Sequence, residues 1–232
     1  MPKKEKIQEM FDRIAPSYDR LNHLMSLNVD KRWRRKALRE IVDETPQRIL
    51  DVACGTGDST IAIARAAAEG SRVTGVDISE GMMGLVMDKA HQEGVAERID
   101  LQVADGEALP FDEGHFDRVN CAFGIRNFEH KEKGLAEFYR VLVPGGKAVI
   151  LELSVPRPRV VRWVYDLYFL HILPRIGAAV SGDKAAYAYL PASVHAFPAP
   201  EVFMEMMKSA GFFRVRSRSL SLGLCRIFVG EK

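Results

Sequence analysis

The sequence has few cysteines and no long apolar run. Its three cysteines, Cys54, Cys121 and Cys225, are widely separated and form neither a C-x-x-C pair nor a spacing typical of metal ligands. This odd, sparse set of thiols predicts a reduced, cytoplasmic protein without a metal site. No apolar stretch approaches the ~20 residues of a membrane-spanning helix, and the first residues lack the apolar core of a signal peptide.

The net charge is small, but the basic residues are unevenly distributed. The 232 residues include 33 Lys or Arg and 31 Asp or Glu, for a formal net charge of +2. Residues 1–39 hold most of the basic excess, and the run at residues 31–36, KRWRRK, is its densest part. This run is either a solvated helix face or a contact region for a membrane surface or an acidic ligand.

Residues 49–58, ILDVACGTGD, form the strongest local pattern in the chain. The apolar residues 49–52 predict a buried strand, and the Ala- and Ile-rich residues 59–68 favour a helix. Gly55 and Gly57 lie in the turn between them. Such a turn lets a ligand approach the backbone closely at the N-terminus of the helix.

Two classes of ligand use this geometry. A dinucleotide-binding loop has three glycines, G-x-G-x-x-G, but the third position here is Thr60. An acid, Asp51, precedes the glycines instead, as in the S-adenosylmethionine loop of class I methyltransferases. The ammonium group of that cofactor is a partner for a carboxylate. We therefore expect Asp51, Gly55, Thr56 and Gly57 to bind S-adenosyl-L-methionine, and a ligand-free strand–turn–helix is the alternative.

Acidic residues also follow the next two predicted strands. Asp77 ends the strand 72–77, where nucleoside-binding α/β folds use a carboxylate to accept hydrogen bonds from ribose hydroxyls. Asp105 follows the strand 99–104, and in the methyltransferase pattern this acid lies beside the adenine amino group. The remaining expected cofactor-binding residues are Ile78, Gly106 and Ala122.

Strands and helices alternate along the chain, which predicts an α/β fold with a doubly wound, mostly parallel sheet. We expect seven strands, the last antiparallel, in the Rossmann-like fold of class I S-adenosylmethionine-dependent methyltransferases. One domain should span residues 1–232, with an N-terminal helical cap (1–45) and a substrate-side insertion (156–198). Pro16 should interrupt the helical pattern of the cap. Further predicted elements are helices 80–93, 131–142 and 200–210, and a strand 147–153 after the turn Pro144–Gly146.

The site should lie where the strand order reverses, because ligands of open α/β sheets bind there. In this topology the reversal falls between the first and fourth strands. The loop at residues 123–128 would then face the glycine loop and bring Arg126 and Asn127 to the crevice. Arg126 could instead form a surface salt bridge. Tyr18, just after Pro16, is either a packing residue or part of the site.

The insertion is rich in aromatic and aliphatic side chains. Its predicted helix, 159–173, is apolar around much of its circumference but too short to span a bilayer. Two interpretations remain open. The insertion is an additional core layer, or it is a lid over an apolar substrate that dips into a membrane surface.

Five motifs are spread over nearly the whole chain. They are residues 11–22 (FDRIAPSYDRLN), 105–111 (DGEALPF), 123–127 (FGIRN), 140–146 (RVLVPGG), and Tyr187-x-Tyr189-Leu190-x-x-Ser193. Together they resemble the motifs of the ubiquinone/menaquinone biosynthesis C-methyltransferases. The FGIRN loop is the most specific of them, whereas a Pro-Gly-Gly turn is common to many methyltransferases.

This resemblance implies methyl transfer from S-adenosyl-L-methionine to a ring carbon of a polyprenylated quinol. Demethylmenaquinol is the expected substrate, and the methoxybenzoquinol precursor of ubiquinone is the alternative. A ring carbon becomes nucleophilic when the adjacent hydroxyl is deprotonated, but a phenol pKa near 10 makes that anion scarce at neutral pH. We expect Arg126 to stabilise the phenolate and Asn127 and Tyr18 to orient the hydroxyl. His130 and His171 are candidate general bases.

A polyprenyl quinol substrate predicts peripheral contact of a cytoplasmic enzyme with the inner face of a membrane. A homodimer or a quinone-biosynthesis complex is the assembly to consider. Two other functions remain open at this point: a cofactor-binding accessory subunit that methylates no quinol, and a methyltransferase for RNA or protein. The modest net charge and the lack of an aromatic platform argue against nucleic acid as a partner.

Overall fold

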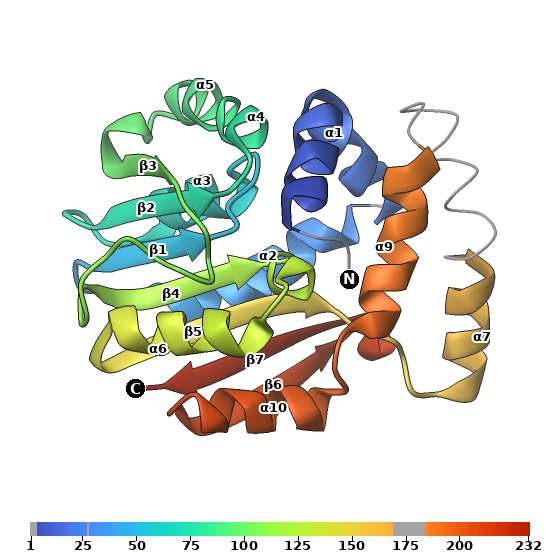
Figure 1. Ribbon diagram of the computed structural model, residues 1–232. Helices are drawn as coiled ribbons and strands as arrows, with labels where there is room; N and C mark the ends of the chain where they lie inside the picture. Colours follow the sequence, from blue (N-terminus) through green and yellow to red (C-terminus); the bar gives the residue numbers. More distant parts are fainter. Residues whose placement is uncertain (1–3, 27, 169–183) are drawn as a thin grey trace.

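A central sheet of seven strands organises the chain. The computed structural model describes residues 4–26, 28–168 and 184–232. The strand order is β3-β2-β1-β4-β5-β7-β6 (Figure 1). Strands β1 to β5 pair in parallel, and β7 runs antiparallel to both β5 and β6. The predicted doubly wound, seven-stranded sheet with an antiparallel last strand is confirmed.

The strands are β1 (Arg48–Val52), β2 (Arg72–Asp77), β3 (Ile99–Val103), β4 (Phe116–Ala122), β5 (Leu142–Leu153), β6 (Phe213–Leu220) and β7 (Cys225–Glu231). The helices are α1 (Lys4–Met25), α2 (Val29–Ile41), α3 (Asp58–Ala66), α4 (Glu80–Met83), α5 (Val86–Gln92), α6 (Lys131–Val141), α7 (Arg159–Leu167), α9 (Lys184–Ala196) and α10 (Pro200–Ser209). Short 3-10 turns lie at η1 (Ala96–Arg98), η2 (Ile125–Asn127) and η4 (Ser221–Gly223).

The strand order reverses at β1, which lies between β2 and β4. Asp51 of β1 is in register with Gly75 on one side and Asn120 on the other. The loops that follow β1 and β4 therefore open on the same edge of the sheet, as the sequence predicts. Helices α1 and α9 stand beyond this edge (Figure 1).

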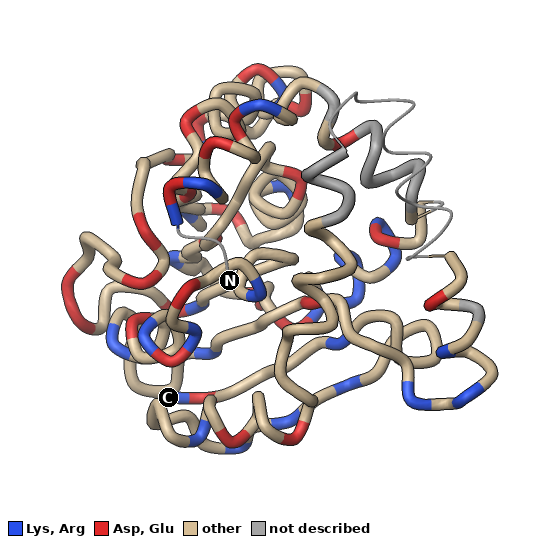
Figure 2. Tube along the Cα trace, turned by 45° about the vertical axis from the view of Figure 1, so that its right-hand side comes forward, with Lys and Arg blue, Asp and Glu red and all other residues tan. Residues whose placement is uncertain are grey.

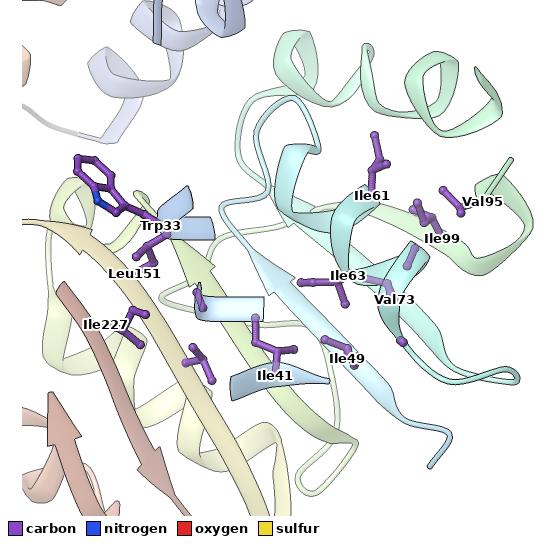
Figure 3. Packing of buried hydrophobic residues seen from close by; sticks show 14 of the residues in the cluster. Trp33, Ile41, Ile49, Ile61, Ile63, Val73, Val95, Ile99, Leu151 and Ile227 are labelled. Carbon is purple, nitrogen blue, oxygen red and sulfur yellow. The ribbon is translucent and has the colours of Figure 1, made fainter. Parts of the chain in front are cut away.

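Apolar side chains cover both faces of the sheet. On one face, Trp33 and Ile41 of α2 and Ile63 of α3 pack with Ile49 and Leu151 of the strands (Figure 3). On the other face, α6 and α10 bury their phenylalanines and leucines, Leu135, Phe138 and Phe203 among them. Each such buried side chain contributes about 1.5–3 kcal/mol. The two layers hold the carboxyl ends of the strands in fixed relative positions.

Helix α1 continues through Pro16, so the predicted interruption is wrong. A proline inside a helix leaves the carbonyl four residues earlier without its partner. Here that residue is Asp12, and its side chain is tied to the sheet domain: Asp12 Oδ1 accepts hydrogen bonds from Ser79 Oγ (2.5 Å) and Gly81 N (3.1 Å). Packing of α1 on the rest of the chain thus offsets the local cost of Pro16.

Two further boundaries differ from the prediction. The helix expected at 80–93 is divided into α4 and α5, because Gly81 and Gly84 are poor helix formers and Gly81 packs closely on Asp12. The segment Pro144–Gly146 lies inside β5 rather than before it. Gly145 has φ 80°, and the register between β4 and β5 is irregular nearby, so the predicted turn is a distortion of a longer strand.

The described part of the insertion consists of α7 and α9. The predicted helix 159–173 is seen as α7 to Leu167, and residues 169–173, including His171, lie outside the described residues. Among the described residues, no helix combines the length and the apolarity needed to cross a bilayer.

Candidate functional site

The glycine loop after β1 is held by the acid that ends β2. Gly55 and Gly57 have φ values of 55° and 84°. A Cβ on Gly57 would lie 2.6 Å from Val86 Cγ1, so only glycine fits this turn. Asp77 Oδ2 accepts a hydrogen bond from Gly55 N at 2.8 Å, and Asp77 Oδ1 accepts one from Ser79 N at 2.9 Å. Asp77 therefore positions the loop and still has lone pairs for a ribose hydroxyl.

Asp51 lies at the bottom of the crevice and is almost fully buried. Its carboxylate oxygens accept hydrogen bonds from Thr60 Oγ1 and Asn120 Nδ2, both at 2.6 Å. Burial raises the pKa of Asp51 from 3.8 to about 6, although these two hydrogen bonds act in the opposite direction. A carboxylate held ionised in such a place is suited to a cationic group of a ligand.

From the raised pKa of Asp51 we predict how the free energy of unfolding depends on pH. The folded pKa lies above the unfolded one, so the ionised carboxylate lowers the free energy of unfolding as pH rises from about 4 to 6. The cost at pH 7 is about 3 kcal/mol. We expect Asp51→Asn, measured by urea unfolding, to gain stability relative to wild type between pH 5 and pH 8. A difference between the two proteins that does not change with pH would contradict this.

Asp105, which follows β3, is paired with a residue near the N-terminus. Lys4 Nζ of α1 forms an ion pair with Asp105 Oδ2. Asp105 Oδ1 accepts a hydrogen bond from Glu107 N at 3.0 Å, which shapes the turn. A Cβ on Gly106 would lie 2.4 Å from Phe128 Cζ. The backbone of Gly106 therefore lies against an aromatic ring of the opposite loop.

Helix α1 is also bound to the glycine loop. Thr56 Oγ1 donates a hydrogen bond to Asp19 Oδ1, and Lys89 Nζ lies 2.8 Å from both Asp19 Oδ2 and Asp58 Oδ1. These pairs complement the links of α1 through Lys4 and Asp12. Helix α1 thus contacts all three loops that carry predicted cofactor-binding residues, and it covers the crevice.

Arg126, in η2 after β4, is buried and paired with Glu152 of β5. The exposed fraction of Arg126 is 5%, and that of Glu152 is 0%. Arg126 Nη1 lies 2.9 Å from Glu152 Oε1, and Arg126 N donates to Glu152 Oε2 at 3.1 Å. Arg126 Nη1 also donates to the carbonyl of Phe123. Arg126 Nε has no hydrogen-bond partner among the described residues, which leaves one buried donor available.

Tyrosines surround this ion pair. Tyr189 of α9 donates a hydrogen bond from its hydroxyl to Asn127 Oδ1 at 3.1 Å. Burial by itself lowers the pKa of Arg126, but Glu152, Tyr18 and Tyr189 raise it, and the net shift of the pKa is upward. Burial raises the pKa of Tyr189 as well. The insertion therefore contributes a polar group to the site and is not only a core layer.

These residues surround one crevice, which encloses about 920 Å³ of empty space, part of it open to solvent. The predicted site residues that line it are Tyr18, Asp51, Gly55, Thr56, Asp77, Ile78, Asp105, Gly106, Ala122 and Asn127. Gly57 and Arg126 do not line the crevice: Gly57 lies in the glycine turn, and the buried Arg126 lies in η2, one residue before the lining residue Asn127. His130 is exposed and does not line the crevice.

Sequence reasoning missed several residues of the crevice. Lys4 and Arg34 line it, and Arg34 lies over the ring of Phe123, with 4.9 Å from the guanidinium carbon to the ring centre. Asn120 donates a hydrogen bond to Asp51, and Glu152 forms an ion pair with Arg126. The buried polar residue inside each apolar strand, Asn120 in β4 and Glu152 in β5, is a signal that could have revealed them.

Comparison with known proteins shows the family to which the chain belongs. The model of the ubiE/COQ5 methyltransferase family matches residues 1–232. The chain belongs to this family. The demethylmenaquinone methyltransferase of Bacteroides fragilis is 43% identical over 230 residues, which cover 99% of this chain and 94% of the relative. The ubiquinone/menaquinone biosynthesis C-methyltransferase UbiE of Geobacter sulfurreducens is 47% identical over 99% of this chain and 90% of the relative.

Solved structures agree on the fold of this methyltransferase. The cyclase SpnF has a TM-score of 0.75 at 18% identity, covering 100% of this chain and 97% of its own. A Haemonchus contortus phosphoethanolamine N-methyltransferase bound to S-adenosyl-L-methionine has a TM-score of 0.62 at 19% identity, covering 86% of this chain and 52% of its own. The predicted class I methyltransferase fold is confirmed.

The methyltransferase family of the chain and a solved neighbour bound to S-adenosyl-L-methionine support the predicted cofactor. The crevice fits this group. The glycine turn leaves room at the N-terminus of α3, and carboxylates stand where β1, β2 and β3 end. Met82 lines the crevice, whereas Met83 is buried in α4 and does not line it.

Proposed function

We propose that this methyltransferase transfers a methyl group from S-adenosyl-L-methionine to a ring carbon of demethylmenaquinol. One observation carries the proposal: the FGIRN loop brings Asn127 into the same crevice as Asp51 and Asp77, and the residue before it, Arg126, is buried with its Nε unpartnered among the described residues. The names of relatives at 43–47% identity support the substrate class.

The reaction requires that the pKa of the quinol hydroxyl be lowered and that the ring carbon be aligned with the methyl group. S-adenosyl-L-methionine supplies a methyl group on a sulfonium, which is a good leaving group. Asn127 and Tyr18 hydrogen-bond the quinol oxygen beside the nucleophilic carbon. The guanidinium of Arg126, acting through Nε–H, stabilises the phenolate as its charge develops. Loss of the hydroxyl proton to water delivers electron density to the ring carbon that would be held near the methyl group. The ring hydrogen that the methyl group replaces leaves as a second proton, also to water.

Glu152 positions Arg126 for this role. The carboxylate accepts from both the side chain and the backbone N–H of Arg126, which fixes the 3-10 turn and the guanidinium together. Glu152 also offsets part of the positive charge. The directed Nε–H, rather than a free cation, is therefore the group offered to the substrate.

Helices α1 and α9 exclude water from the reaction. Helix α1 contacts the loops after β1, β2 and β3, and Tyr189 of α9 reaches Asn127 of the loop after β4. Met10 and Ile14 of α1 form an apolar cluster against which Tyr189 of α9 packs. An unscreened site strengthens the electrostatic effect of Arg126.

The quinone pool of cells that lack the protein tests the proposal. We expect mass spectrometry to detect demethylmenaquinone in place of menaquinone, and the wild-type gene to restore menaquinone. An unchanged pool would overturn the quinol assignment. Accumulation of a demethylated ubiquinone precursor would shift it to the alternative substrate, since the name of the Geobacter sulfurreducens relative includes both quinones.

A substrate with a polyprenyl tail resides in a bilayer. We therefore include peripheral contact with a membrane in the proposed function. The contact must bring the strand ends, where the crevice opens, close to the lipid surface.

A further inference from the structure

The outer face of α7 exposes large apolar side chains. Val160, Trp163 and Leu167 have exposed fractions of 75%, 66% and 43%. Their spacing of three and four residues places them on one side of the helix. Tyr165, on the opposite side, is buried. We call Val160, Trp163 and Leu167 the apolar stripe.

The outer face of α2 is basic. Lys31, Arg32, Arg35, Lys36 and Arg39 are all exposed and fall on one side of the helix, while Trp33, Ala37 and Ile41 are buried on the other. Within the described part of the chain, the structure gives none of the five an ion pair. The one acid on the same stretch of α2 surface, Glu40, pairs with Arg216. We call these five residues the basic face.

The turn η4 connects the two surfaces. Trp33 Nε1 of α2 donates a hydrogen bond to Ser221 Oγ at 2.8 Å. On its other side η4 meets the segment that leads to α7, since a Cβ on Gly223 would lie 3.3 Å from Pro156 Cα. Leu222 at the tip of η4 has φ 58° and an exposed fraction of 72%. The apolar side chain of Leu222 therefore projects between the basic face and α7.

Arginines extend the basic charge up to the apolar stripe. Arg157, Arg159 and Arg162 are exposed around the start of α7. Figure 2 shows blue Lys and Arg segments at its lower right, where the chain leads into α7. The nearest acids, Glu201 and Asp166, pair with Arg157 and Arg162. Arg159, next to Val160, has no ion-pair partner among the described residues.

We propose that the apolar stripe, Leu222 and the basic face form one docking surface for an anionic phospholipid bilayer. Basic residues near a bilayer are attracted by anionic headgroups, and tryptophan favours the interface between headgroups and acyl chains. A nucleic acid would leave Val160, Leu167 and Leu222 exposed. The unpaired charges of the basic face would repel a second copy of the same surface.

The surface lies on the crevice side of the molecule. Helix α7 follows the carboxyl end of β5 and stands beyond the strand ends (Figure 1). Its buried Tyr165 is close enough to Arg126 for the guanidinium to oppose the rise in the tyrosine pKa caused by burial. One side of α7 thus approaches the site while the other carries the apolar stripe. This inference rests on the proposed function for its purpose, because docking here would bring a lipid-borne quinol to the crevice.

Vesicle binding by the full chain tests the proposal. We expect flotation with vesicles of phosphatidylcholine and 30% phosphatidylglycerol, no flotation with phosphatidylcholine alone, and release at high salt. Arg32→Glu/Arg35→Glu should lower the partition coefficient at least about 25-fold, since each basic residue contributes about fivefold. Lys133→Glu/Lys208→Glu, on α6 and α10 of the opposite face, makes the same charge change and should leave binding within about twofold.

Trp163 gives a second readout. It is one of two tryptophans, and the other, Trp33, is buried. Addition of anionic vesicles should shift the emission to shorter wavelength, and Trp163→Phe should abolish the shift. Emission that is already at short wavelength without vesicles, or binding that is equal in wild type and Arg32→Glu/Arg35→Glu, would overturn the proposal. So would tight binding of duplex RNA without vesicle binding.

Activity separates this inference from the proposed function. Arg32→Glu/Arg35→Glu should keep wild-type turnover of a short-tailed quinol in solution and lose turnover of a long-tailed quinol in anionic vesicles. If wild type methylates the vesicle-borne quinol without binding vesicles, the docking surface is wrong and the function stands. If it binds vesicles but methylates no quinol, the function is wrong and the surface stands.

Discussion

Arg126→Ala is expected to lower kcat for quinol methylation by about 10²–10³-fold, the usual cost of losing one donor to a developing oxyanion. The same change leaves Glu152 buried without its cation, because this carboxylate has an exposed fraction of 0% and Arg126 is its ion-pair partner. The free energy of unfolding should therefore fall by about 3–5 kcal/mol. Steady-state kinetics and urea unfolding measure the two effects separately.

The double variant Arg126→Gln/Glu152→Gln separates catalysis from stability. It removes both charges while it keeps groups of similar size that can hydrogen-bond each other, so most of the stability should return. Methylation should remain low, and the affinity for S-adenosyl-L-methionine should stay within a few-fold of wild type. A double variant with wild-type kcat would remove Arg126 from the mechanism and leave the pair a structural role.

Asp77→Ala is expected to raise the Kd of S-adenosyl-L-methionine by about 10- to 150-fold, as measured by isothermal titration calorimetry. The loss of a hydrogen bond to a charged acceptor costs about 1.5–3 kcal/mol. The substitution also leaves Gly55 N without its acceptor, which loosens the glycine turn. Asp100→Ala, an exposed acid on the neighbouring β3, is the matched control and should bind like wild type. Equal affinities for all three proteins would rule out the ribose role of Asp77.

The cofactor side of the crevice could be predicted because its chemistry is local in the sequence. An acid and two glycines within seven residues define the loop after β1, and the acids after β2 and β3 stand at strand ends that the apolar pattern marks. The parallel topology then brings these ends together, as the pairing of β1 with β2 and β4 shows.

The partners of these residues could not be predicted, because they come from distant parts of the chain. Lys4 is 101 residues from Asp105, and Asp51 is 69 residues from Asn120. Arg126 is 26 residues from Glu152, on the adjacent strand. A single sequence carries no record of which polar groups meet in the fold. For this reason the sequence predicted Arg126 at the crevice or in a surface salt bridge, where the structure has a buried ion pair with Glu152.

The prediction of a break at Pro16 was wrong for a different reason. Local propensity predicts a break, and it describes an isolated helix correctly. The contacts of Asp12 with Ser79 and Gly81, and those of Asp19 with Thr56 and Lys89, hold α1 on both sides of the proline. Tertiary contacts of this kind override a local preference of about 3 kcal/mol.

Methyl transfer in vitro tests the central claim most directly. Purified wild-type protein is incubated with S-adenosyl-L-methionine carrying a ¹³C-methyl group and with chemically reduced demethylmenaquinone, and the product is examined by NMR. The account predicts a ¹³C signal of a methyl group on a ring carbon, which requires the reduced quinol and is lost in Arg126→Gln/Glu152→Gln. A label on the quinol oxygen, or no labelled quinone although the cofactor binds, would contradict it.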